Sequence, residues 1–326
     1  MRSTRIAATL WAIATMTLVA CSSKFGTFAT APNAHDYDPS SIVRPATSVI
    51  PTNVARTTGL VYVSGDLCNC VEIFRKSDGV LIGALTNGVA QAEGLFVDAA
   101  LNLYVANQSA GNVLVFHEGQ TTAFRVLDDP WGWVNDVAVD SDGTTYVANE
   151  ADFPDNPGDV SVYAPGKTER SAVITDPRFY DLYAVDLDSS HHVYISYFDP
   201  NYVSHIDEII DGRIVDLGLQ TRGWGFFDFV LDGNNDIVAQ SGSQNHHGIS
   251  VFPPGHRWPS KRLGIWGTGY MALDASETHI FAVDQGGVAG VWEFSYPNGR
   301  LLKTLTGPFG AGNNPIGVAV SPPAKL

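Results

Sequence analysis

The feature that most constrains this chain is a strand pattern that recurs six times. Each copy is a short apolar run that ends near an anchor residue, and a second run such as Leu103–Asn107 follows it. The anchors are Asp98, Asp140, Asp188, Asp232, Asp274 and Ser321, with spacings of 42, 48, 44, 42 and 47 residues. A repeat of this length that contains strands and no helix is typical of propeller blades. The sequence therefore predicts an all-β fold, a six-bladed β-propeller.

Each blade is predicted to contain four strands. In the copy that begins at Gly94, the runs Gly94–Asp98, Leu103–Asn107, Asn112–Phe116 and Thr122–Leu127 give the strands from the innermost to the outermost. The third strand recurs most visibly, at 71–74, 160–163, 249–252 and 291–294, with a more degenerate copy at 206–209.

The two ends of the repeat region predict how the ring closes. Leu60–Ser64 resembles a second strand but has no inner strand before it. Ile316–Val320 resembles an inner strand, and little follows it except Pro322 and Pro323. Pairing the two would complete the first blade and remove an exposed edge. We therefore expect the C-terminal strand to close a propeller domain over residues 58–326.

The N-terminus has the organisation of an export signal. Arg2 and Arg5 precede Ile6–Ala20, an uncharged and mostly apolar stretch of 15 residues. A bilayer-spanning helix needs about 20 residues, so this stretch is short for a membrane anchor. Residues 1–20 are therefore predicted to be a signal peptide.

The run Leu18–Cys21 resembles the lipobox of bacterial lipoproteins. The resemblance implies cleavage before Cys21, acylation of its sulfur and a lipid-anchored location in the cell envelope. Ser22 at the next position implies the outer membrane if the host is Gram-negative. The alternative is an ordinary secretory signal in which Cys21 has no role. Residues 21–57, rich in Ser, Thr, Ala and Pro, are expected to be the lipidated Cys followed by a flexible linker.

The charge of the chain restricts its partners. It carries 19 Lys and Arg against 34 Asp and Glu, a net charge of −15, and loss of Arg2 and Arg5 with the signal peptide makes this −17. Nucleic acid and anionic membrane surfaces are therefore poor partners, and we expect membrane contact through the lipid anchor.

Two cysteines, Cys68 and Cys70, lie within the predicted propeller. Export permits a disulfide, although a bond between residues so close would close a very small loop and add little stability. No second Cys pair or nearby His in the sequence completes a metal site with them.

The connections between blades carry large aromatic residues. Tyr180, Trp224 and Trp266 each lie eight residues before an anchor Asp, and Trp131 and Trp133 straddle the same position. These five residues are predicted to form an aromatic rim that binds a glycan, peptide or protein ligand. The alternative is that they fill the wedges between neighbouring blades.

The blades resemble the NHL-type repeats of six-bladed bacterial propellers. The resemblance is carried by Gly94–Asp98, by the strand "NLYVAN" at 102–107, by the turn "VYAPG" at 162–166 and by Pro315–Val320. It covers nearly the whole chain after residue 59 and implies a scaffold much more strongly than a reaction.

The chain also resembles the gluconolactonase and regucalcin-like propellers. That resemblance implies a divalent cation, Ca²⁺ or Zn²⁺, above the channel, held by a Glu, two Asn and an Asp near the starts of inner strands. Glu93 and Asn135 match in residue type, five residues before their anchors, whereas Tyr183 and Phe227 occupy the next two equivalent positions. Three carboxylates lie within two residues of this offset and permit a rearranged site: Asp136, Asp181 and Asp228.

These observations favour a lipid-anchored, non-catalytic propeller that binds a ligand or a protein. No catalytic residue is assigned, because the sequence contains no Gly-x-Ser-x-Gly elbow and no phosphate-binding glycine loop. The alternative function is a metal-dependent, lactonase-like hydrolase.

Substitution of Cys21→Ser is expected to move the protein from the membrane fraction to the soluble fraction, because the acylated sulfur is the predicted tether. Fractionation of cells that express each form, followed by immunoblotting, measures this. Membrane association that is unchanged in the variant would rule out Cys21 as the anchor.

Overall fold

The computed structural model describes residues 59–65, 68–130, 132–151, 157–221, 225–243, 246–264, 269–284, 289–307, 309 and 314–324. The predicted signal peptide, Cys21 and the linker lie outside these ranges. No helix in the described ranges has the length and apolar character needed to cross a bilayer.

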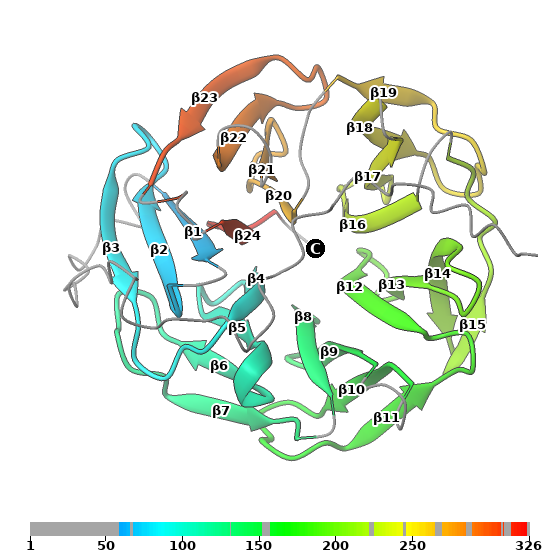
Figure 1. Ribbon diagram of the computed structural model, residues 1–326, viewed down its shortest axis with the longest axis horizontal. Helices are drawn as coiled ribbons and strands as arrows, with labels where there is room; N and C mark the ends of the chain where they lie inside the picture. The colour runs from blue at the N-terminus through cyan, green and yellow to red at the C-terminus, as the bar shows by residue number, and fades with distance from the viewer. Residues whose placement is uncertain are drawn as a thin grey trace, which may run out of the picture. The chain divides into compact units, whose positions relative to one another are not determined.

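The described residues form six antiparallel sheets of four strands each, arranged as the blades of a propeller around a central axis (Figure 1). From the innermost strand outward, blade 1 consists of β24 (Pro315–Ser321), β1 (Leu60–Gly65), β2 (Cys70–Arg75) and β3 (Leu81–Leu85). Blade 2 consists of β4 (Ala92–Val97), β5 (Leu103–Asn107), β6 (Asn112–Phe116) and β7 (Arg125–Asp128). Blade 3 consists of β8 (Trp133–Val139), β9 (Thr145–Glu150), β10 (Asp159–Tyr163) and β11 (Ala172–Thr175).

The other three blades have the same order. Blade 4 consists of β12 (Asp181–Leu187), β13 (Val193–Phe198), β14 (Ser204–Ile210) and β15 (Arg213–Val215). Blade 5 consists of β16 (Gly225–Leu231), β17 (Ile237–Ser243), β18 (His246–Phe252) and β19 (Lys261–Leu263). Blade 6 consists of β20 (Met271–Leu273), β21 (His279–Asp284), β22 (Gly290–Ser295) and β23 (Leu301–Leu305). A single 3₁₀ turn, η2 (Gln108–Ala110), is described between β5 and β6.

The ring closes as the sequence predicts. β24 pairs with β1 in antiparallel register, from Leu60 opposite Ser321 to Gly65 opposite Pro315. Ser64 strengthens the closure, because its Oγ accepts a hydrogen bond from Gly317 N at 2.7 Å and donates one to Glu93 O at 2.6 Å. The first blade is thereby joined both to the end of the chain and to blade 2.

The apolar core lies between neighbouring blades. One cluster joins Ile73 and Leu85 of blade 1 to Leu95 and Val105 of blade 2, all of them buried. Every residue of β5 is buried, whereas the outer strand β7 has only one buried residue. Inner and middle strands are therefore apolar on both faces, which explains why their runs stand out in the sequence.

The recurring Asp anchors shape the turn that follows each inner strand. In four blades, the anchor carboxylate accepts a hydrogen bond from the backbone N–H four residues later. The pairs are Asp98 with Asn102 at 2.8 Å, Asp188 with His192 at 2.9 Å, Asp232 with Asp236 at 3.0 Å and Asp274 with Thr278 at 3.1 Å. An Asp suits such turns because its side chain bonds to nearby backbone groups. Ser321 replaces it in blade 1, where β24 is not followed by a turn into the second strand.

The inner strands of blades 1 to 5 share an irregularity near their starts. In blades 2 to 5 the register shifts between Ala92 and Leu95, Val134 and Asp136, Leu182 and Ala184, and Phe226 and Phe229. In blade 1 it shifts between Val63 and Gly65, opposite the start of β24. Such β-bulges re-aim side chains and are frequent beside functional sites. The residues inside the bulges of blades 2 to 5 include the positions that lie five residues before their anchors: Glu93, Asn135, Tyr183 and Phe227.

The structure joins Cys68 and Cys70 by a disulfide in the turn between β1 and β2. Both residues are buried. The bond therefore belongs to the packing of blade 1.

Deletion of residues 315–326 is expected to abolish cooperative folding, because it removes β24 and exposes an edge of β1. Circular dichroism during heating measures this. A sharp thermal transition in the truncated protein would show that the ring does not need its closing strand.

Candidate functional site

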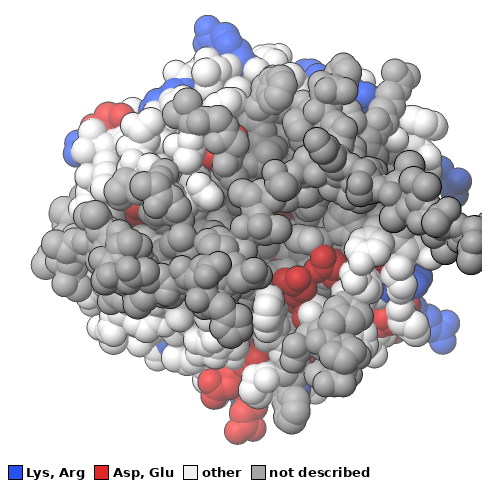
Figure 2. Space-filling view, in the orientation of Figure 1, with Lys and Arg blue, Asp and Glu red and all other residues white. Residues whose placement is uncertain are grey.

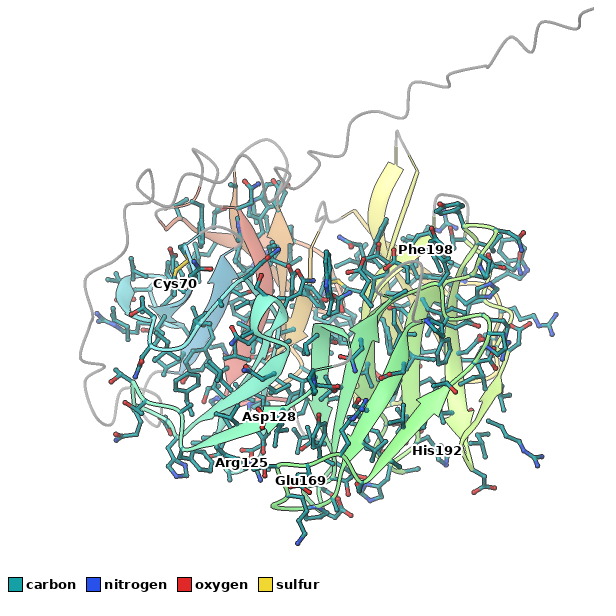
Figure 3. All side chains as sticks on the ribbon, turned by 60° about the horizontal axis from the view of Figure 1, so that its bottom comes forward. Cys70, Arg125, Asp128, Glu169, His192 and Phe198 are labelled. Atoms are coloured by element: carbon teal, nitrogen blue, oxygen red, sulfur yellow. A yellow bond between two sulfur atoms is a disulfide. The ribbon has the colours of Figure 1, made fainter. Side chains whose placement is uncertain are left out.

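The candidate site lies at the end of the ring axis where the inner strands begin. We use the term mouth for a connected group of residues at this place: Glu93, Gln108, Asn135, Glu150, Asp181, Tyr183, Phe198 and Phe227. Figure 3 shows Phe198 and His192 at opposite ends of blade 4, so Phe198 marks the face of the propeller that carries the mouth. On this face, acidic side chains reach the surface near the axis, over the region where Figure 1 places β8 and β12 (Figure 2).

Tyr270 separates the mouth from the channel beneath it. This residue precedes β20 in blade 6, and its phenol donates hydrogen bonds to Asn135 O at 3.0 Å and to Tyr183 O at 3.1 Å. Those carbonyls belong to the inner strands of blades 3 and 4, so the side chain spans the axis. Gly94 leaves room for the carboxyl group of Asp136, because a Cβ at position 94 would collide with it.

Three carboxyl groups join neighbouring blades around the channel. The N–H of Val185 donates to Asp136 Oδ2 at 3.1 Å, that of Leu231 to Asp186 Oδ2 at 2.8 Å, and that of Met271 to Asp228 Oδ2 at 2.6 Å. All three line a cavity of about 100 Å³ that runs from Tyr270 to Pro323 and Ala324. Asp136 and Asp228 therefore face the channel beneath the mouth.

Burial makes these channel carboxyl groups weak acids. It raises the pKa of Asp186 to about 7 and the pKa values of Asp136 and Asp228 well above the ordinary range of Asp. Their mutual repulsion acts in the same direction. Asp136 and Asp228 therefore keep their protons to a higher pH than an ordinary Asp, and each links its own blade to the next.

The mouth contains a second group of carboxyls, formed by Glu150 at the end of β9 and Asp181 at the start of β12. Burial, followed by the neighbouring Asp181, raises the pKa of Glu150 to about 8, and the two side chains are hydrogen-bonded to each other. Tyr183 Oη donates to Asp181 Oδ2 at 2.7 Å, and Asn135 Nδ2 donates to Glu150 Oε2 at 3.4 Å. At neutral pH, Glu150 therefore keeps its proton beside the carboxyl group of Asp181.

Asn135 is held in place by a hydrogen-bond network. Its Oδ1 accepts from Gln108 Nε2 at 2.7 Å, and its Nδ2 donates to Leu182 O at 2.8 Å. The residue is buried. Glu93 lies close enough for its charge to raise the pKa values of Tyr183 and Tyr270.

Three aromatic rings adjoin the carboxyl pair. Tyr183, Phe198 and Phe227 contact one another with ring centroids 5.5 to 5.6 Å apart. All three are half-buried. Tyr183 belongs to both groups, because its hydroxyl is bonded to Asp181 while its ring packs against the two Phe rings.

The predicted aromatic rim is only partly described. Trp131, Trp224 and Trp266 lie outside the described residues. Trp133 is 53% exposed and is paired with Glu150 across β8 and β9, so it stands beside the mouth. Tyr180 packs against Tyr202, with ring centroids 5.1 Å apart and hydroxyl oxygens 3.0 Å apart.

Between blades 3 and 4, the residue that packs into the space between the sheets is Phe179, next to the predicted Tyr180. Phe179 is buried and packs edge-on against Tyr197 at 5.1 Å. Trp133 does not have this role, because about half of its surface is exposed.

The five predicted metal ligands do not converge. Glu93, Asn135 and Asp181 belong to the mouth, whereas Asp136 and Asp228 face the channel below it. The amide oxygen of Asn135 accepts a hydrogen bond from Gln108, and aromatic residues occupy two of the equivalent positions. The described residues therefore do not fit the ligand set that the gluconolactonase resemblance implies.

Within the described ranges, one group of three His and acidic side chains has ligand atoms within 4.8 Å of one another: His205, Asp207 and Asp216. It belongs to the outer half of blade 4. The carboxylate of Asp207 already accepts hydrogen bonds from Tyr197 Oη at 2.7 Å and Leu217 N at 3.2 Å, and Arg178 Nη1 lies 3.8 Å from it. A cation there would compete with that guanidinium group.

The site residues predicted from the sequence do not include Gln108, Glu150 or Phe198. Glu150 lies at the end of a second strand, and its partner Asp181 comes from the next blade. The signal that could have found it is an acidic residue directly after the "YVAN" that ends at Asn149.

Comparisons with known proteins support the fold alone. No family model and no curated protein matches the chain. Among solved structures, a protein of unknown function from Bacteroides caccae has a TM-score of 0.62 and 12% identity, covering 81% of this chain and 99% of its own. A chain of a nidogen/laminin complex has a TM-score of 0.61 and 13% identity, covering 81% of this chain and 98% of its own. A hydrazine synthase structure from Kuenenia stuttgartiensis has a TM-score of 0.54 and 15% identity, covering 79% of this chain and 80% of its own.

Stability is expected to fall as pH rises from about 4 to 7, because folded Asp186 keeps a proton that the unfolded chain loses near pH 4. Each unit of raised pKa is worth about 1.4 kcal/mol at higher pH. Asp186→Asn imitates the neutral carboxyl and should lose less stability between pH 5 and 8. Urea unfolding at both pH values measures this, with Asp211→Asn in an exposed turn as the control. An equal loss in Asp186→Asn and in the original chain would contradict the assignment.

Proposed function

We propose that this chain is an exported, lipid-anchored propeller that binds a ligand at the mouth without transforming it. The observation that carries the proposal is the hydrogen-bonded network that fixes the mouth residues in place. Gln108 holds Asn135, Asn135 contacts Glu150, and Tyr270 spans the axis to the backbone of the same strands. A binding site needs such fixed supports, because they hold its recognition groups in position before the ligand arrives.

The position of the mouth suits a protein tethered by its N-terminus. The chain enters the propeller at Leu60, which pairs with Ser321 at the end of β24. The mouth lies at the other end of the inner strands. The described part of the chain therefore enters the propeller at the end opposite the mouth.

Recognition is favoured over catalysis by the chemistry of the mouth residues. The eight residues that define the mouth include no Ser, Cys or His, so a Ser–His or Cys–His nucleophile is absent from this group of residues. Carboxyl and aromatic groups are the features that the described residues provide. Such groups give orientation and contact area to a bound molecule.

A metal-dependent, lactonase-like hydrolase is the second candidate. The observation in its favour is the placement of Glu93 and Asn135 within the bulges of β4 and β8. Tyr183 and Phe227 at the corresponding bulges oppose it, because aromatic rings offer no ligand to a hard cation.

Thermal-shift titration with oligosaccharides, peptides, small amines, Ca²⁺ and Zn²⁺ tests the proposal. At least one organic class should raise the unfolding temperature of the original chain. Phe198→Leu should weaken that response about tenfold, the loss expected for one well-placed aromatic contact of about 1.4 kcal/mol. Trp258→Ala should leave it unchanged, because this exposed Trp lies in the turn between β18 and β19.

Two outcomes of this experiment would overturn the proposal. One is a response that Phe198→Leu and Trp258→Ala alter equally. The other is a response to Ca²⁺ or Zn²⁺ alone, together with metal-dependent lactone hydrolysis, which would establish the second candidate.

A further inference from the structure

We propose that the ligand of the mouth carries a primary ammonium group on an apolar chain, and that this group binds between the Glu150–Asp181 pair and the neighbouring aromatic rings. This inference rests on the proposed binding function and names the chemical class of the ligand. A lysine side chain and a small alkylamine share this chemistry.

One oxygen of the carboxyl pair has no donor outside the pair. Asp181 Oδ2 accepts from Tyr183 Oη, but Asp181 Oδ1 is buried, and in the described part of the chain its one donor is the carboxyl group of Glu150. An ammonium group supplies N–H donors and a positive charge together. It can therefore replace the proton of Glu150 and donate to both carboxylates, since charge-assisted hydrogen bonds are the strongest of those available here.

The aromatic rings provide the second half of the site. Tyr183 is bonded to Asp181 through its hydroxyl, and its ring contacts both Phe198 and Phe227 at 5.6 Å. Aromatic faces attract cations and also cover alkyl groups. A cation with an apolar chain would use both properties, with its charge at the carboxyl pair and its chain along the rings.

Other ligand classes use less of this arrangement. A neutral sugar would leave the charge of the pair without compensation, which is costly for half-buried groups. An anion would face repulsion from Glu93, Asp181 and the net charge of −15. A divalent cation would need more oxygen ligands than the described mouth brings together, and the rings would contribute none.

Binding of an ammonium group should depend on pH. Glu150 is faced by Asp181 from β12 and by Asn135 from β8. Tyr270 and Tyr183 are also near it, because a negative charge on Glu150 raises the pKa of both phenols. The raised pKa of Glu150, about 8, means that its carboxyl group becomes negatively charged only above that pH. Affinity should therefore rise from pH 6.5 to 8.5, because the ammonium group takes the place of the departing proton.

Isothermal titration of the full chain with n-pentylammonium at pH 6.5 and 8.5 tests the inference, with 1-pentanol as the neutral probe and CaCl₂ as the metal probe. The amine should bind about tenfold tighter at pH 8.5, as expected for exchange against one proton. Pentanol should bind at least tenfold more weakly than the amine, because it lacks the charge.

Two variants and a matched control locate the binding. Asp181→Asn should weaken amine binding about tenfold or more, and Glu150→Gln should also remove its pH dependence. Glu169→Gln removes the same charge from an exposed loop, which Figure 3 shows at the opposite end from Phe198, and should change neither. Thermal unfolding of each variant without ligand confirms that it is folded.

Several results would overturn the inference. Amine binding that Asp181→Asn leaves unchanged would place the amine elsewhere, and equal affinity for pentanol would remove the role of charge. If oligosaccharides or peptides without amines act at the mouth and the amine does not, the ligand class is wrong while the proposed function stands. If no organic probe responds to the mouth variants, both fail.

Discussion

The structure depends on the antiparallel pairing of β24 with β1. A propeller blade packs its two faces against its neighbours, so a blade without its inner strand would leave an apolar surface and an unpaired edge in the middle of the ring. The C-terminal strand fills that place, and Ser64 links it to blade 2 through Gly317 and Glu93 O. This closure brings the starts of the inner strands together around one axis. Without this closure, the mouth residues of blades 2 to 5 would not be held close together around the axis.

Side chains at two levels of the axis have different roles. Below Tyr270, buried carboxyl groups such as Asp186 accept hydrogen bonds from the next blade, and burial raises the pKa of Asp186 to about 7. Above it, the bulges of the inner strands aim polar and aromatic residues toward the mouth. A bulge interrupts regular pairing, so its recurrence in five consecutive blades is evidence of a common use. This arrangement brings Glu150 and Asp181 together, with the hydroxyl of Tyr183 bonded to Asp181.

The sequence predicted the scaffold more fully than the site. The limits of β5 and β6 agree to the residue, because these buried strands are continuous apolar runs between polar turns. The outer strand β7 begins at Arg125 instead of the predicted 122, because an exposed edge imposes a weaker pattern. Equal spacing from the anchors made Asp136 and Asp181 look like members of one set. It could not show that one faces the channel and the other the mouth, since the direction of a side chain is decided by bulge geometry. It also could not show the contact between Glu150 and Asp181, which come from different blades.

The proposed site depends on Glu150 keeping its proton to about pH 8 beside Asp181, and carboxyl ¹³C NMR measures this. Spectra recorded from pH 3 to 10 on the original chain and on Asp181→Asn would follow the carboxyl carbon of Glu150. Glu150 should titrate near pH 8 in the original chain and at a lower pH in the variant, which lacks the neighbouring Asp181 carboxyl group. Titration of Glu150 below pH 5 in both proteins would contradict it.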